Sequence, residues 1–200
     1  MLETAAQAAA IPSSRSVSHL HARDSAGWLV TGTGSLVLGA GIWLSLQESL
    51  WAWATGQIVV ALALLQWFII LHEAGHNTLF RTRSLNRLIG HVASVPALIP
   101  FHNWRRIHGR HHKYTGWQDL DATTALLVPR PIRRWEQWLM DFCWATGLPL
   151  FSILYRIQNY WNLPRVARYL ERPEHVRAAR RNAFLLGLSY LVALVVVAAI

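Results

Sequence analysis

The sequence is short of cysteine and of charge, and each shortage excludes a class of protein. Cys143 is the single cysteine among 200 residues, which excludes an intramolecular disulfide and any zinc site built from several cysteines. Charged residues make up 14% of the chain, against about 25% in ordinary soluble domains. Hydrophobic residues reach 53%. This composition predicts a membrane protein.

Acidic residues are also scarce, at 10 Asp and Glu against 19 Lys and Arg, for a net charge of +9. Apart from Arg15 and Arg23, every basic residue lies between Arg81 and Arg181. Basic patches can bind nucleic acid, but cationic segments beside apolar runs are the usual cytoplasmic signature of membrane proteins. We therefore expect one basic face and no nucleic-acid partner.

Three apolar runs are long enough to predict membrane spans, because a helix needs about 20 apolar residues to cross a bilayer. They cover about 28–46, 53–71 and 184–200. Residues 1–27 lack the apolar stretch of a signal peptide and are predicted to form a mobile cytoplasmic tail. The link 47–49 has no Lys or Arg, whereas three arginines follow the second span closely. The positive-inside rule then places both flanks of this hairpin in the cytoplasm.

The remaining apolar segments are too short or too interrupted to span a membrane. Residues 88–101 contain Pro96 and Pro100, which favours an interfacial or re-entrant segment. Residues 135–161 carry two helical apolar stripes separated by Pro149, so we expect amphipathic helices lying in the membrane plane.

Two histidine clusters carry the chemistry. The first is His72-Glu73-Ala74-Gly75-His76, at the end of the second predicted span, and the second is His108-Gly109-Arg110-His111-His112. Imidazoles three or four positions apart share one face of a helix, and two such faces can converge on a metal. The predicted fold is all-α, with integral membrane helices, interfacial amphipathic helices and a cytoplasmic, histidine-rich metal face.

The residue types alone leave the metal open. The first cluster matches H-E-x-x-H, in which two histidines bind zinc and Glu73 acts as the base of a protease. Catalytic zinc needs only three protein ligands, so five imidazoles favour a two-metal site. Imidazole suits iron, copper, nickel or zinc. The nearby Arg105, Arg106 and Arg110 either hold an anionic head group or form an ordinary cytoplasmic flank. His91 and His175 stand alone and are interpreted as a packing residue and an exposed residue.

The order of these motifs resembles the membrane fatty acid desaturases over roughly residues 28–125. The resemblance rests on a hairpin of spans, H-x3-H, and Trp104-Arg105-Arg106-Ile107-His108 opening an H-x2-H-H box. It implies a non-haem diiron centre that uses O₂ and two electrons to remove two hydrogens from a lipid acyl chain. It also implies an external donor of the ferredoxin or cytochrome b5 type. The iron ligands would be His72, His76, His108, His111 and His112, with Glu73 and Asp119 or Asp121 bonded to ligand imidazoles.

The third histidine box of that family has no counterpart, because His175 is the only histidine after His112. This absence predicts that residues 28–200 form a desaturase-like domain incomplete at its carboxyl end, unable alone to hold a whole diiron site. A related lipid or carotenoid hydroxylase or ketolase, the zinc protease and an inactive truncated remnant stay open as alternatives. The near absence of lysine, with Lys113 alone, indicates a bacterial inner membrane.

Overall fold

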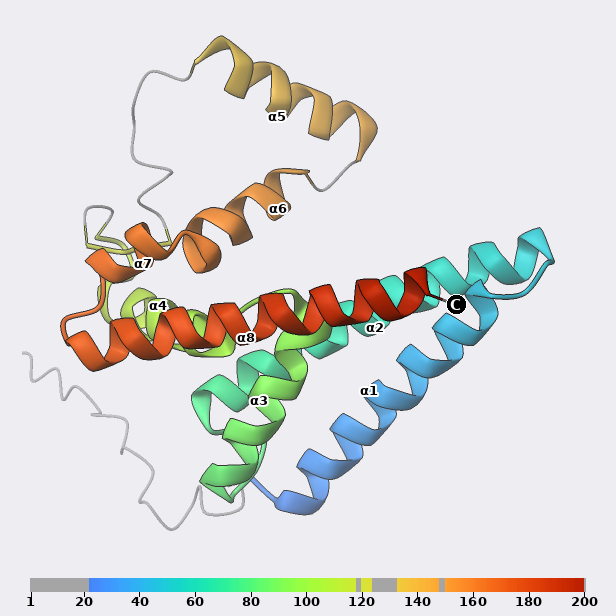
Figure 1. Cartoon of the computed structure of the whole chain (residues 1–200), viewed down its shortest axis with the longest axis horizontal. Coiled ribbons are helices and arrows are strands. Elements are labelled where there is room, and N and C mark those ends of the chain that lie inside the picture. The colour runs from blue at the N-terminus through green and yellow to red at the C-terminus, as the bar shows by residue number, and fades with distance from the viewer. Residues whose placement is uncertain (1–21, 118–119, 124–132, 148–149, 200) are drawn as a thin grey trace, which may run out of the picture.

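The computed structural model describes residues 22–117, 120–123, 133–147 and 150–199. Those ranges contain helices and no strand (Figure 1). In chain order the elements are α1 (Asp24–Ser45), α2 (Leu50–His76), α3 (Arg83–Ala97), α4 (Phe101–Tyr114), α5 (Arg134–Thr146), α6 (Leu150–Arg156), the π-helical η2 (Ile157–Trp161), α7 (Leu163–Arg168) and α8 (Pro173–Ala198). The all-α prediction is confirmed.

Three helices, α1, α2 and α8, are long and apolar enough to cross a membrane. They confirm the three predicted spans, although each begins before the predicted residue. The largest difference is at α8, which was predicted to begin near residue 184 and not at Pro173. Proline instead occupies the first turn of the helix, where its missing N–H leaves no hydrogen bond unmade. The basic residues that follow it therefore belong to α8. Residues 1–21 of the predicted tail lie outside the described ranges, and α1 begins at Asp24.

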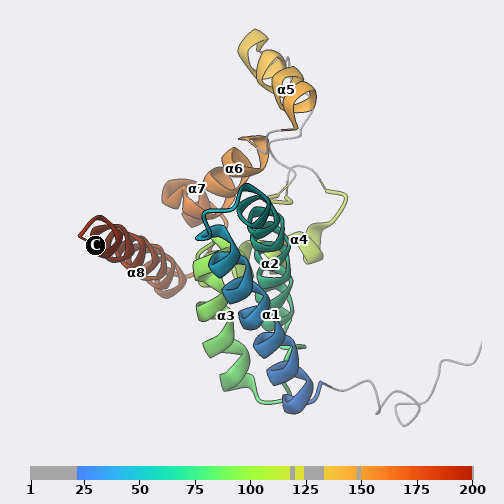
Figure 2. The same cartoon turned by 90° about the vertical axis from the view of Figure 1, so that its right-hand side faces the viewer.

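The helices α1 and α2 form an antiparallel hairpin held close by glycine (Figure 2). A Cβ at Gly41 would lie 2.9 Å from the backbone nitrogen of Val60, and one at Gly56 would lie 2.9 Å from the carbonyl oxygen of Gly41. Close packing through glycine is therefore found at Gly41. Gly32 and Gly39 have no neighbour within 4 Å of such a Cβ, so they face away from the hairpin.

The segment predicted as interfacial forms most of α3 and a sharp turn into α4. One face of α3, including Ile89, Ala93 and Ala97, is buried and packs along α2. Leu98 then adopts a left-handed conformation, with φ 57°, and reverses the chain. Pro100 precedes α4, which packs back against α2. This turn brings the second histidine cluster beside the first.

The amphipathic region folds as α5, α6 and η2. The helix expected to end at Pro149 ends earlier, at Thr146, where Gly147 follows with φ 67°, and Pro149 lies outside the described residues. Helix α5 buries no residue and projects from the rest of the molecule (Figure 1); Cys143 lies on it, half-buried. The indole nitrogen of Trp161, at the end of η2, donates to the Leu98 carbonyl oxygen at 2.9 Å. This bond fixes η2 to the α3–α4 turn.

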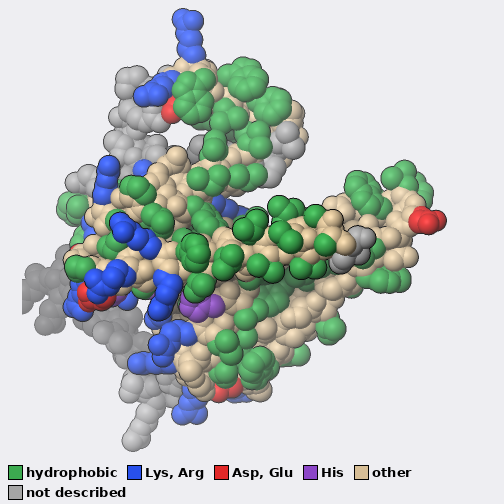
Figure 3. Space-filling model, in the orientation of Figure 1, with side chains coloured by type: hydrophobic (Ala, Val, Ile, Leu, Met, Phe, Trp, Pro, Cys, Tyr) green, Lys and Arg blue, Asp and Glu red, His purple; other side chains and the backbone are tan. Residues whose placement is uncertain are grey.

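The buried core lies between α2, α3 and α4, where the largest fully buried side chains include Trp104 and Phe80. The outer faces of the three long helices instead expose apolar side chains (Figure 3). Lys and Arg side chains gather towards one end of this view, around the start of α8. This distribution is typical of a protein surrounded by lipid along its helices and by water at its basic end.

Candidate metal centre

The last turn of α2 presents the first histidine cluster. His72 and His76 are four residues apart, and the helix ends at Asn77, whose left-handed φ of 61° turns the chain away. The Glu73 carboxylate lies 3.0 Å from His72 Nδ1 and accepts a hydrogen bond from the Thr78 hydroxyl at 2.6 Å. Glu73 therefore holds the His72 ring through Nδ1 and leaves its Nε2 for a metal.

Four imidazoles meet between α2 and α4. The candidate ligand atoms all lie within 4.8 Å of one another and belong to His72, His76, His108 and His112. His108 Nε2 is 3.1 Å from His76 Nε2 and 3.0 Å from His112 Nε2. Nitrogens bound to one ion at about 2.1 Å stand roughly 3.0–3.4 Å apart in octahedral or tetrahedral geometry. The spacing of these side chains therefore fits a bound metal ion.

Burial keeps the imidazole of His108 neutral, which is the form that binds a metal ion. Desolvation, with the positive charge that neighbouring imidazoles carry when protonated, lowers the pKa of His108 from 6.5 to about 3. The ring is therefore neutral near pH 7, with a nitrogen lone pair available. Metal-binding histidines must be neutral, so the site is prepared electrostatically as well as geometrically.

The buried Trp104 packs against the histidine cluster. Its indole is buried, stacks on His108 with ring centroids 4.3 Å apart and meets the His72 ring edge-on at 5.4 Å. A Cβ at Gly75 would lie 2.2 Å from Trp104 Cζ3, so only glycine leaves room for the indole. Sequence reasoning assigned Trp104 no role, although it lies one helical turn before His108 and so on the same face.

His111 stands beside the group of four and has its own carboxylate partner. Its Nδ1 lies 2.7 Å from Asp121 Oδ2 and 2.9 Å from the Thr123 hydroxyl. Burial alone would raise the pKa of Asp121, but hydrogen bonds from Thr123 and His111 outweigh it and hold this pKa below its usual value. A carboxylate on the outer nitrogen orients a metal-binding imidazole. Asp119, proposed for this task from the sequence, lies outside the described residues.

The three arginines near the cluster have different surroundings. Arg110 donates to the Leu120 carbonyl oxygen at 3.0 Å, and its guanidinium lies 4.7 Å from the centre of the Tyr114 ring. It thereby holds the segment that carries Asp121. Arg106 contacts His175 Nε2 at 2.9 Å, so His175 is half-buried and bonded where it was expected to be exposed. Burial, together with two neighbouring arginines, lowers the pKa of Arg105.

A second group of polar residues, at the start of α4, was missed from the sequence. The backbone nitrogen of His102 donates to Asn182 Oδ1 at 2.9 Å, and Asn182 Nδ2 lies 3.2 Å from His91 Nδ1. His91 also packs edge-on against Phe101 at 5.1 Å, the packing role expected of it. Burial, and then the charges of Arg106 and His175, lower the pKa of His102 to about 4.

Comparison with known proteins gives a consistent set of relatives. The family model for fatty acid desaturases matches residues 48–200. An sn-1 oleoyl-lipid 12-desaturase of Anabaena variabilis is 33% identical over 139 residues, which cover 67% of this chain and 36% of the relative. An sn-1 oleoyl-lipid 12-desaturase of a Picosynechococcus strain is 42% identical over 62 residues, 31% of this chain and 18% of the relative.

A third relative is the sn-1 acyl-lipid omega-3 desaturase (ferredoxin) of a Nostoc strain, 44% identical over 56 residues, 28% of this chain and 16% of the relative. The chain thus matches between 16% and 36% of the length of these three relatives. No solved structure matches the chain significantly.

Proposed function

The chain belongs to the fatty acid desaturase family, and from that premise we propose that it takes part in the O₂-dependent removal of two hydrogens from the acyl chain of a lipid. The observation that carries this proposal is the meeting of His72 and His76 with His108 and His112 at metal-binding distances. The printed names of the relatives, oleoyl-lipid and acyl-lipid desaturases, support an acyl lipid as the substrate class.

We propose that the metal is iron, held by these four imidazoles, and that His111 would be a ligand of a second iron ion. When bound, two iron ions with O₂ and two electrons supply the oxidation. The protein's own residues orient and enclose the site: Glu73 and Asp121 hold the outer nitrogens of His72 and His111, and the buried Trp104 keeps water from the inner side. The head-group role of Arg105, Arg106 and Arg110 stays part of the proposal.

The electron donor and the location are also proposals. The ferredoxin in the name of the Nostoc relative supports a ferredoxin-type donor over a cytochrome b5 type. Arg81, Arg83 and Arg87 follow α2 closely, and the positive-inside rule supports a metal site on the cytoplasmic side of a bacterial inner membrane. The relatives named above are all desaturases, so the comparisons give no support to the hydroxylase, protease or remnant alternatives.

Metal analysis of the purified chain tests the proposal. Plasma mass spectrometry on the detergent-purified protein should find iron, lost in His108→Ala and retained in His175→Ala, the control outside the cluster. Lipid analysis of a host that expresses the chain with a ferredoxin then measures turnover, and no new double bonds are expected from these 200 residues alone. Zinc that is lost in His76→Ala but retained in His112→Ala, or no metal at all, would contradict the proposal. Turnover by these 200 residues alone would contradict the prediction of an incomplete site.

A further inference from the structure

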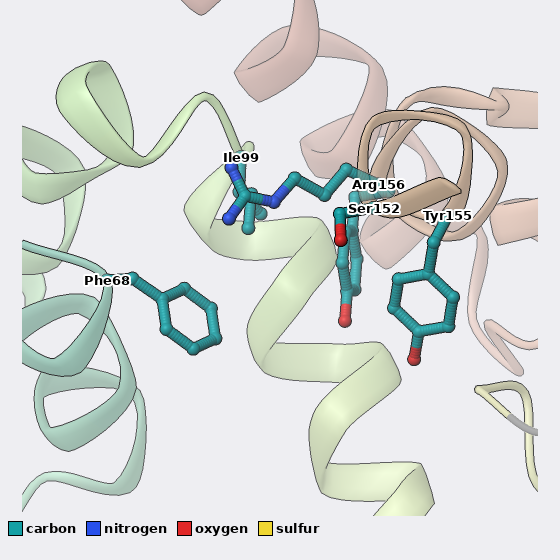
Figure 4. A pocket seen from close by; sticks show the side chains of 6 residues that line it. Phe68, Ile99, Ser152, Tyr155 and Arg156 are labelled. Atoms are coloured by element: carbon teal, nitrogen blue, oxygen red, sulfur yellow. The ribbon is translucent and has the colours of Figure 1, made fainter. Parts of the chain in front are cut away.

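A cavity of about 240 Å³ lies between α2, the α3–α4 turn and the α6–η2 segment. Figure 4 shows Phe68 approaching it from α2, and Ser152, Tyr155 and Arg156 approaching it from α6. The full lining is Phe68, Ile99, Ser152, Tyr155, Arg156 and Tyr160. The wall is therefore partly aromatic and aliphatic, with three hydroxyl groups and one guanidinium.

The guanidinium of Arg156 has little to bind within the protein. Its Nη1 donates to the Ala97 carbonyl oxygen at 3.3 Å, and its carbon lies 6.0 Å from the centre of the Phe68 ring. A guanidinium offers five N–H donors, so most of them remain for another acceptor. No carboxylate pairs with Arg156 in the part of the chain that the structure describes. The sequence has no Asp or Glu between Phe142 and Leu170.

The charged and apolar parts of the pocket lining together indicate one class of ligand. A half-buried cation with no carboxylate partner among the described residues attracts an oxyanion into a partly apolar pocket, because withdrawing charge from water is favourable only when the charge is compensated. The planar guanidinium matches carboxylate and phosphate oxygens. An inorganic anion would gain nothing from Phe68 and Ile99, whereas the first methylene groups of an acyl chain would be buried against them.

The pocket is separated from the metal centre by two aromatic rings. Phe68 meets Trp104 edge-on, with centroids 6.5 Å apart and planes at 87°. Trp104 in turn stacks on His108. A molecule in the pocket therefore lies behind the Phe68 and Trp104 rings and does not contact the histidines.

We propose that this pocket binds the oxyanion head of an acyl amphiphile, a carboxylate or a phosphate, with Arg156 as the anchoring cation. Ser152 and Tyr155 supply hydroxyl donors, and Phe68 and Ile99 contact the first methylene groups. The inference concerns binding alone and requires neither metal nor turnover. A binding experiment therefore tests it independently of the proposed function.

Equilibrium dialysis of the chelator-treated 200-residue chain in nonionic detergent tests this. The probes are oleate, oleyl alcohol and an oleoyl lysophosphatidic acid, each at the same detergent concentration. Arg156→Gln should weaken binding of the anionic probes by about tenfold or more, the usual effect of losing a charge-assisted hydrogen bond. Binding of oleyl alcohol, which has the same chain without the charge, should stay nearly unchanged. Comparing oleate with the phosphate-bearing probe identifies the preferred head group.

The matched control is Arg168→Gln, which removes the same charge from an exposed position on α7. It should leave oleate binding unchanged. Equal losses in Arg156→Gln and Arg168→Gln, equal losses for oleate and oleyl alcohol, or no saturable oleate binding to the original chain would each overturn the proposal. If circular dichroism shows that Arg156→Gln does not fold, Arg156→Lys replaces it. That variant should bind oleate several-fold more weakly, because lysine lacks the planar fork, and unchanged affinity would overturn the proposal.

Discussion

The side-chain oxygen of Asn182 accepts a hydrogen bond from the backbone nitrogen of His102 at 2.9 Å. His102 lies in the first turn of α4, where backbone N–H groups have no partner within the helix. Helix α8 thus supplies a cap for α4 through Asn182, which follows His102 by 80 residues in the chain. Because α4 carries three of the five clustered histidines, the contact makes the placement of the proposed metal ligands depend on α8.

Replacing Asn182 by leucine should therefore disturb both the fold and the site. An unsatisfied N–H costs about 1–3 kcal/mol, so Asn182→Leu should lower the free energy of unfolding by that order and weaken metal binding. Denaturant unfolding in detergent, followed by circular dichroism, and metal titration measure the two effects. Ser189→Ala is the control, since the Ser189 hydroxyl bonds only to the Leu186 carbonyl oxygen within α8. Equal effects of the two substitutions would contradict a capping role.

Replacement by alanine of the two glycines within the histidine clusters, Gly75 and Gly109, should have opposite effects on thermal stability. Gly75→Ala places a Cβ 2.2 Å from Trp104 Cζ3, so the indole must move away from His108, and metal content and thermal stability should both fall. Gly109→Ala meets nothing within 4 Å and should stabilise α4 by up to about 1 kcal/mol through helix propensity. Thermal unfolding and metal analysis of both variants check this. A loss of metal in Gly109→Ala matching that in Gly75→Ala would show that steric fit is not the cause.

The carboxylate of Asp121 should matter for metal affinity. Asp121→Asn removes the charge 2.7 Å from His111 Nδ1, and loss of such a partner typically costs about 10–100-fold in affinity. Competition with a chelator at neutral pH measures the change. Asp141→Asn, on the exposed face of α5, should have no effect. The prediction fails if Asp121→Asn binds metal as tightly as the original chain.

The metal-free protein should lose stability as the solution becomes acidic. The pKa of His102 is lowered from 6.5 to about 4, first by burial, so the unfolded chain binds more protons than the folded chain between these values. The contribution of His102 to the free energy of unfolding is therefore fully present above about pH 6.5 and declines as pH falls towards 4. His102→Gln should flatten this dependence, measured by denaturant unfolding across the range. An equally steep decline in the variant would assign the effect to other histidines, such as His108.

Local spacing predicted the parts of the site that lie on one helix. Imidazoles at i and i+4 share a face, so His72 with His76 and His108 with His112 were predictable, as were the apolar spans. Contacts between distant segments were not: nothing local indicates that Asn182 caps α4, or that Asp121 bonds His111. The start of α8 at Pro173 was not predicted, because proline both breaks helices and begins them, and only the packing of α8 decides between the two.

One continuous helix, Leu50–His76, is both a candidate membrane span and the carrier of two of the proposed metal ligands. At 1.5 Å per residue it is about 40 Å long, whereas the hydrocarbon core of a bilayer is about 30 Å thick. We therefore expect the last turns, with His72 and His76, to stand beyond the hydrocarbon, together with α4, which packs on the same helix. A thicker bilayer covers more of α2 and draws the histidines towards the head groups, while a thinner one leaves them further out. We therefore expect lipid composition to set the height of the proposed metal site above the chains of its proposed substrate.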